Sequence, residues 1–175
     1  KYWSRAIRNI KPYTPGEQPR DMKYIKLNTN ENPYTPSPKV LEAISEAAGE
    51  AGENLRLYPD PTCEELRCAI ADYYKLEKQQ VFVGNGSDEL LAFSFLAFFD
   101  SDRPVLFPDI TYSFYRVYAS LFRTDYMEVS LNDDFSIPVE SLFEANGGII
   151  IPNPNAPTGK FLPVRDIASI LEKNE

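Results

Sequence analysis

The sequence predicts an α/β protein with a mainly parallel sheet, preceded by an extended N-terminal arm. From residue 81 onward, short β-branched or aromatic runs alternate with segments whose apolar residues have helical spacing, and parallel sheets are built from that alternation. The first 36 residues lack a sustained apolar period and are interrupted by five prolines, at positions 12, 15, 19, 33 and 36, which favours extended backbone. The chain has 175 residues, of which 43% are hydrophobic and 25% charged, so it is long enough to bury a core.

Two helices are expected between the arm and the sheet. Ser37 is a good N-cap and Pro38 suits the first helical position, so a helix is predicted from there to Gly49 or Gly52. Its apolar face is formed by residues 40, 41, 44 and 48. The Thr-Cys-Glu-Glu segment at 62–65 has the pattern of a capping box and predicts the start of a second helix.

The remaining elements alternate strand and helix, as the fold class requires. Strands are predicted at 81–83, 105–107, 126–129 and 149–151, and helices at 87–99, 112–121, 139–145 and 163–175. No strand follows the last helix, although a crossover helix ordinarily leads to another strand. We therefore expect this sequence to be the N-terminal part of a larger enzyme.

Composition excludes several kinds of function. The net charge is −8 and the basic residues form no cluster longer than a pair, which disfavours a nucleic-acid or anionic-membrane surface. No apolar run approaches the length of about 20 residues that a membrane span needs, so a cytoplasmic protein is expected. Histidine is absent, which excludes histidine-based triads, bases and metal sites. Cys63 and Cys68 lack the spacing of zinc ligands, so no metal site is expected and both are interpreted as structural thiols.

Three loops are the candidate site, because ligands of open parallel sheets bind beyond the carboxyl ends of the strands. Residues 84–89 (Gly-Asn-Gly-Ser-Asp-Glu) lead into a helix, where exposed N–H groups favour a phosphate; a plain tight turn is the alternative. Tyr112 follows a strand and is either a stacking platform for a planar ring or a core residue. Residues 152–159 contain three prolines and a glycine, which favours the rigid presentation of an asparagine amide.

Taken together, these residues resemble the fold-type I aminotransferases that use pyridoxal 5′-phosphate, and more narrowly the histidinol-phosphate aminotransferase family. The resemblance covers nearly the whole chain. Its motifs are Lys-Pro-Tyr at 11–13, Leu-Asn-Thr-Asn-Glu-Asn-Pro-Tyr at 27–34, Leu-Tyr-Pro-Asp at 57–60, Gly-Ser-Asp-Glu at 86–89, Thr-Tyr at 111–112 and Asn-Pro-Asn-Ala-Pro-Thr-Gly at 153–159. It implies a three-layer α/β/α large domain that is incomplete here, with an arm at 1–36, a helical part of the small domain or linker at 37–80 and the N-terminal part of the cofactor-binding domain at 81–175.

The resemblance also implies roles for individual residues. Residues that would bind the cofactor are Gly86, Ser87 and Asp88 at the phosphate, Tyr112 on the pyridine ring, Asn155 near the phenolic oxygen, and Tyr58, which would reach the partner's cofactor across a homodimer interface. Residues that would line the substrate pocket are Tyr13, Asn30 and Asn32. Relatives usually carry Asn directly before Pro-Thr-Gly, where this chain has Ala156, so either Asn155 supplies that contact or the contact is missing.

The catalytic lysine and the aspartate that contacts the pyridine nitrogen would lie downstream of Glu175, and Lys160 is not that lysine. The chain by itself is therefore expected to be inactive. The complete protein would transfer amino groups between histidinol phosphate and 2-oxoglutarate, with glutamate as the second product. The alternatives are threonine-phosphate decarboxylase, another aminotransferase of the same fold, and a non-catalytic truncated domain.

Overall fold

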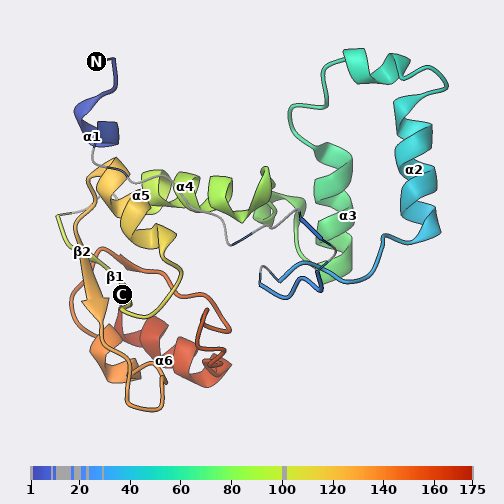
Figure 1. The fold of residues 1–175 in the computed structure, drawn as a ribbon. Helices are drawn as coiled ribbons and strands as arrows, with labels where there is room; N and C mark the ends of the chain where they lie inside the picture. The colour runs from blue at the N-terminus through green and yellow to red at the C-terminus, as the bar shows by residue number, and fades with distance from the viewer. Residues whose placement is uncertain are drawn as a thin grey trace. The chain divides into compact units, whose positions relative to one another are not determined.

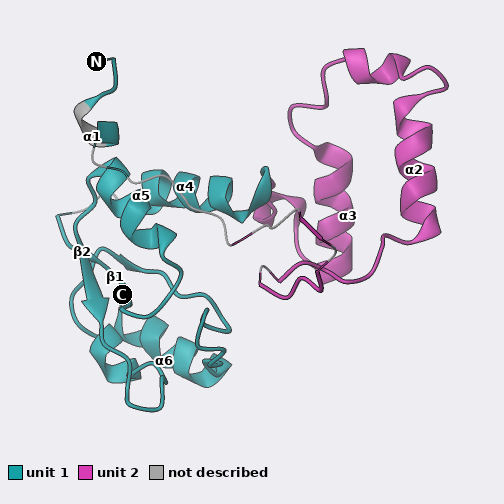
Figure 2. Ribbon diagram, in the orientation of Figure 1, with its two compact units in different colours: residues 1–11, 84–175 teal, residues 12–83 magenta. Residues whose placement is uncertain are grey.

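The computed structural model describes residues 2–8, 10, 17, 21–22, 24–28, 30–99 and 102–174. The chain divides into two compact units: residues 1–11 with 84–175, and residues 12–83. Figure 1 shows the elements and Figure 2 shows the division. The domain boundaries expected at residues 36 and 80 remain a prediction.

The unit formed by residues 12–83 is helical. Helix α2 (Pro38–Ala48) begins after Ser37, whose hydroxyl accepts the Val40 N–H, and ends at Gly49, where φ is 82°. This confirms the predicted N-cap and the predicted end. The unit also contains the 3₁₀ segments η1 (Glu53–Arg56) and η2 (Lys78–Gln80) and the helix α3 (Glu64–Tyr74). Cys63 and Cys68 are free thiols.

The second helix begins differently from the predicted capping box. The carboxylate of Asp60 accepts the N–H groups of Thr62 and Glu64, at 2.9 and 2.7 Å, and the Thr62 hydroxyl at 2.8 Å. Cys63, the residue before α3, is in the left-handed region at φ 48° and makes no side-chain cap. The start of α3 was therefore predicted correctly, but Asp60 caps it rather than Thr62.

The other unit is built on a parallel sheet. Strand β1 (Val105–Pro108) pairs with β2 (Tyr126–Val129) and with β3 (Gly148–Ile149), giving the order β2-β1-β3. Val105 lies opposite Tyr126 on one side and Gly148 on the other. The helices are α4 (Gly86–Phe98), α5 (Phe114–Phe122), α6 (Val164–Lys173), the short α1 (Arg5–Arg8) and the 3₁₀ segment η3 (Val139–Leu142).

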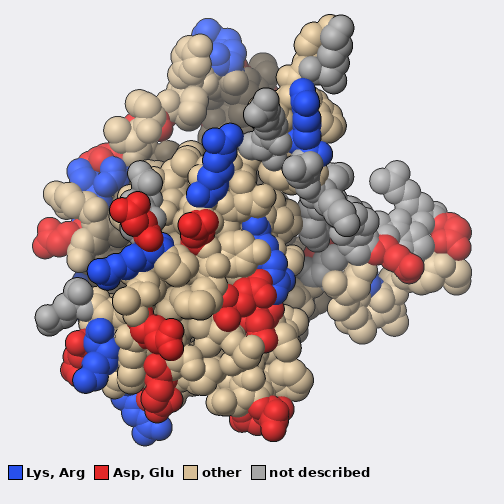
Figure 3. Space-filling view, turned by 90° about the vertical axis from the view of Figure 1, so that its left-hand side faces the viewer, with Lys and Arg blue, Asp and Glu red and all other residues tan. Residues whose placement is uncertain are grey.

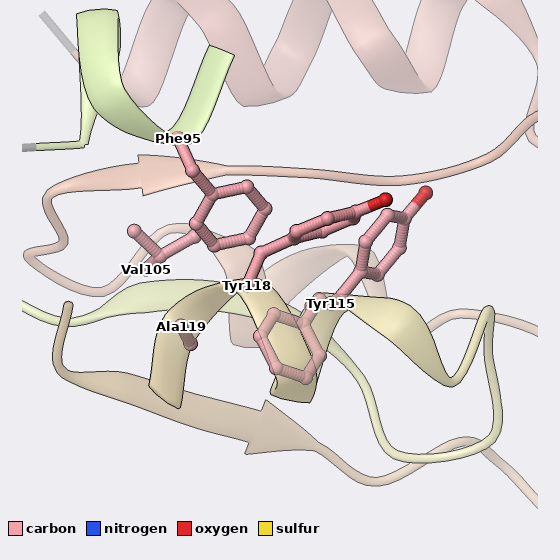
Figure 4. Packing of buried hydrophobic residues seen from close by; sticks show 6 residues of the cluster. Phe95, Val105, Tyr115, Tyr118 and Ala119 are labelled. Carbon is pink, nitrogen blue, oxygen red and sulfur yellow. The ribbon is translucent and has the colours of Figure 1, made fainter. Parts of the chain in front are cut away.

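Successive side chains of β1 enter two separate cores. Val105 and Phe107 pack with aromatic residues of α4 and α5, among them Phe95 and Tyr118 (Figure 4). Leu106 points the other way and packs with Leu142, Ile170 and neighbouring apolar residues of η3, α6 and the adjoining loops. Since alternate residues of a strand face opposite sides of a sheet, helical layers cover both faces of β1. The predicted three-layer α/β/α arrangement is confirmed.

Three predicted elements differ in the structure. Residues 81–83 form no strand among the described residues, and the Val81 carbonyl instead accepts the Arg67 Nε–H at 2.8 Å. The predicted helix at 139–145 is only the η3 turn, because the Asn146 side chain then bonds locally to the Glu144 carbonyl and the Gly148 N–H. The arm predicted as extended contains α1, which contacts α5.

Candidate active site

The three loops singled out by the sequence meet at one edge of the sheet in the unit formed by residues 1–11 and 84–175. The Tyr112 hydroxyl donates to Asp88 Oδ1 at 2.6 Å, which joins the loop after β1 to the N-terminus of α4. The Thr111 hydroxyl donates to Asn155 Oδ1 at 2.8 Å, which joins the same loop to the segment after β3. Since β1 and β3 are parallel, their carboxyl ends lie at the same edge. The structure therefore brings together Gly86, Ser87, Asp88, Tyr112 and Asn155.

The N-terminus of α4 is shaped to receive an anion. Gly86 has φ 81°, and among the described residues no heavy atom outside Gly86, its chain neighbours and the backbone of α4 lies within 4 Å of where a Cβ would stand. The backbone is therefore left-handed and open at the start of the helix. The first N–H groups of a helix have no partner within it, and they carry the positive end of the helix dipole. Ser87 and Asp88 occupy this first turn and are exposed.

Two carboxylates also lie in this turn, and both are hydrogen-bonded within the chain. Glu89 Oε2 accepts the Asn85 N–H at 2.6 Å, which folds its side chain back over the preceding loop. Asp88 Oδ1 accepts the hydroxyls of Tyr112 and Tyr118, at 2.6 and 3.1 Å. These hydrogen bonds turn the carboxylates of Asp88 and Glu89 toward donors of the chain. Their repulsion of an anion at the helix N-terminus is therefore reduced.

Tyr118 is a site neighbour that the sequence did not reveal, because a buried tyrosine on an apolar helix is indistinguishable from core. Its ring is buried in the cluster with Phe95, whereas its hydroxyl reaches Asp88. Figure 4 shows the ring packed beside Phe95 and the oxygen at the margin of the cluster. Burial, and then the hydrogen bond to Asp88, raises the pKa of Tyr118 above its usual value near 10. The phenol is therefore a neutral donor at physiological pH.

Tyr112 lies in an aromatic group at the mouth of this loop. Its ring is stacked on Phe114, with centroids 5.7 Å apart and planes 19° from parallel, and meets Tyr115 edge-on at 5.6 Å. The side chain is half-buried rather than enclosed. An aromatic face held in this way suits contact with a planar ring.

A charged contact fixes the base of the same loop. Arg116 forms an ion pair with Glu128 of β2 and donates from its Nη2 to the Asp109 carbonyl at 2.6 Å. Asp109 Oδ1 accepts the N–H groups of Ile110 and Leu131, at 2.8 and 3.1 Å. The backbone leading to Thr111 and Tyr112 is therefore held from both sides.

The structure does not place the other four predicted site residues at these loops. Tyr58, Asn30 and Asn32 belong to the unit of residues 12–83 and are exposed, with Tyr58 fully so. Tyr13 lies outside the described residues. Their predicted roles at the cofactor and substrate remain predictions.

Lys160 is held in an ion pair just beyond the proline-rich loop. Its Nζ lies 3.2 Å from Asp134 Oδ2. Hydrogen bonds from Ser136 and then from Lys160 lower the pKa of Asp134 to about 2. Figure 3 shows basic and acidic side chains interspersed over one face of the molecule.

A groove of about 510 Å³ lies between β3 and α6 and is lined mainly by Ile149, Ile151, Ile167 and Leu171. None of the predicted site residues that the structure describes lines it. Within the described residues, no helix has the length and apolar character needed to cross a membrane.

Comparison with known proteins shows which family the chain belongs to. Residues 22–175 match the family model described as aminotransferase class I and II. The chain belongs to this family. It is 58% identical over 175 residues to the histidinol-phosphate aminotransferase of Clostridium beijerinckii and 54% identical over 175 residues to that of Clostridium acetobutylicum. These matches cover the whole chain and confirm the resemblance seen in the motifs.

A solved structure agrees on the fold of this chain. Histidinol-phosphate aminotransferase from Sinorhizobium meliloti, solved in complex with pyridoxal-5′-phosphate, superposes with a TM-score of 0.73 at 24% identity, over 84% of this chain and 40% of that one. The chain spans about half the length of the curated relatives it matches, 48% for the C. beijerinckii enzyme.

Proposed function

We propose that the full-length protein is a pyridoxal 5′-phosphate enzyme that transfers amino groups between histidinol phosphate and 2-oxoglutarate. The observation that carries this proposal is the identity of 54–58% with histidinol-phosphate aminotransferases across the entire chain. Proteins this similar ordinarily share the residues around a reacting centre. Threonine-phosphate decarboxylase stays the alternative, which the test below distinguishes by its substrate.

The residues present fit the proposed cofactor. Its phosphate would be held by the N–H groups and hydroxyl at the start of α4, from Gly86 to Asp88, where the left-handed glycine opens the backbone. Its ring would lie against Tyr112, which the Asp88 hydrogen bond places beside the same helix end. A phosphate site and an aromatic platform joined by a 2.6 Å hydrogen bond suit a phosphorylated planar ring.

Pyridoxal phosphate, when bound, withdraws electrons from the carbon that carries the amino group and so makes its proton acidic. The described residues contribute binding and orientation. The first turn of α4 would hold the phosphate end and Tyr112 would lie against the ring, while Arg116 and Asp109 hold the loop on which Tyr112 lies. The lysine that accepts and returns the proton is expected further along the full-length chain, so residues 1–175 alone should bind at most and not catalyse.

The remaining roles concern the assembly. We infer a homodimer in which Tyr58 contacts the cofactor phosphate of the partner subunit, with Tyr13, Asn30 and Asn32 near the substrate. The full exposure of Tyr58 is compatible with a contact made outside its own unit. A cytoplasmic location is part of the same proposal.

The test is the visible absorbance of the full-length protein mixed with pyridoxal phosphate. We expect a band of bound cofactor that bleaches on addition of histidinol phosphate and returns with 2-oxoglutarate. A band that forms but responds to threonine phosphate instead would overturn the substrate. Absence of any band would overturn the cofactor. Residues 1–175 alone serve as the control and should give no such response.

A further inference from the structure

Asn155 uses its entire side-chain amide within the chain. The amide nitrogen donates to the Ile110 carbonyl at 3.0 Å and to Thr158 Oγ1 at 3.1 Å, and the amide oxygen accepts the Thr111 hydroxyl at 2.8 Å. The residue is 1% exposed. An asparagine amide has only two donor hydrogens, so a contact from Asn155 to a ligand oxygen would require one of these bonds to break and would leave a buried group unpaired.

The backbone of Asn155 is fixed as well. Its N–H donates to the Lys160 carbonyl at 2.8 Å, and its carbonyl accepts the Gly159 N–H at 2.7 Å. The segment from 155 to 160 therefore closes on itself. Two of the three side-chain bonds of Asn155 then cross to Ile110 and Thr111, directly before Tyr112.

We propose that Asn155 is a positioning residue, which ties the loop of Ile110, Thr111 and Tyr112 to the proline-rich loop and influences the cofactor only through Tyr112. This inference rests on the proposed function for the identity of the ligand. Relatives usually carry an asparagine at the position of Ala156, and its side chain contacts the phenolic oxygen of the cofactor. Asn155 does not supply that contact here, because its amide is already hydrogen-bonded within the chain. Ala156 itself is exposed.

The first test is a double-mutant cycle on the full-length protein without cofactor, measured as the thermal unfolding midpoint. Thr111→Val removes the hydroxyl but keeps the shape, and Asn155→Leu removes the acceptor and both donors of the amide at a similar size. We expect each to lower the midpoint and the pair to lower it by clearly less than the sum, because they share one network. Thr111→Ser should restore the wild-type midpoint. If the two losses in midpoint were additive, the proposed connection between the two loops through Asn155 would be wrong.

A matched control lies in the same segment. Asn153 donates to the Leu162 carbonyl at 2.9 Å and accepts the Leu162 N–H at 3.0 Å, and it shares no hydrogen bond with Thr111. Asn153→Ala should therefore be additive with Thr111→Val. Coupling of the same size in this pair would show that the cycle reports general loosening of the loop, and would overturn the specific assignment.

The second test separates positioning from direct contact. In the full-length protein loaded with pyridoxal phosphate, Thr111→Val and the uncharged Asn155→Leu should both speed cofactor dissociation, by roughly five- to tenfold. Neither should move the pH midpoint at which the bound cofactor changes its absorbance. A midpoint that shifts in the Asn155 variant alone would show direct contact. If the wild type binds no pyridoxal phosphate, the proposed function is wrong. The unfolding cycle, which is measured without cofactor, still tests whether Asn155 connects the two loops.

Discussion

Gly86 is the residue whose conformation most directly opens the start of α4. It has φ 81°, and no other part of the described chain approaches an added Cβ within 4 Å, so Gly86→Ala would meet backbone strain without a steric clash. We expect a loss of about 1–2 kcal/mol in unfolding free energy and weaker retention of pyridoxal phosphate by the full-length protein. Urea unfolding and equilibrium dialysis of the cofactor measure the two effects.

Gly52 provides the matched control for this substitution. It has φ 72°, its nearest neighbour to an added Cβ is 3.7 Å away, and it lies in the unit of residues 12–83. Gly52→Ala should therefore cost a similar unfolding free energy and leave cofactor retention unchanged. Equal loss of cofactor in both variants would contradict a specific role for Gly86.

The phenol of Tyr118 makes stability depend on alkaline pH. Burial raises its pKa above the usual value near 10, so the folded state holds this proton more tightly than the unfolded state does. The contribution is fully present below pH 10 and is lost as the pH rises above it, by up to about 1.4 kcal/mol per pH unit. Tyr118→Phe should flatten the fall in unfolding free energy between pH 10 and 12. Tyr115, whose pKa burial also raises, remains in both proteins, so some slope should persist.

The start of α3 shows how an element depends on one residue that lies before it. Asp60 accepts the Thr62 and Glu64 N–H groups at 2.9 and 2.7 Å, and these bonds lower its pKa. Asp60→Ala should destabilise the full-length protein, as the loss of an N-cap does. Thr62→Ala removes only a hydroxyl that donates to Asp60 and should cost less. Chemical unfolding of both variants distinguishes them, and a larger loss for Thr62→Ala would restore the predicted capping box.

The predicted and observed helices and strands show which elements a local sequence determines. Local signals placed α2, α4 and β2 within a residue or so, since caps, helical spacing and β-branched runs act over short distances. Residues 81–83 have strand composition but gain no partner strand among the described residues, and pairing is a tertiary property that composition does not encode.

The candidate site was also predictable only in part: its loops were predicted, but the contacts between their side chains were not. The rule that ligands bind beyond the carboxyl ends of parallel strands identified the loops containing Ser87, Tyr112 and Asn155. It did not indicate that Asn155 bonds to Thr111, or that Tyr118 reaches Asp88, because those contacts join residues 44 and 30 positions apart. Residue type and spacing identify a loop, whereas the partners of its side chains are set by the packing of the sheet and helices.

At the scale of the whole molecule, the proposed homodimer predicts that each site combines residues of two chains. If Tyr58 serves the partner's cofactor while Ser87 serves its own, full-length Tyr58→Ala and Ser87→Ala chains are each impaired at both sites of their own dimers. A dimer that contains one chain of each kind regains one intact site and has both defects in the other. Random mixing makes half of the dimers of this kind, so the mixture should approach roughly a quarter of wild-type activity. Activity after co-refolding in equal amounts measures this, with each variant refolded alone as the control. A mixture no more active than the average of the two separate variants would show that Tyr58 acts within its own chain or not at all.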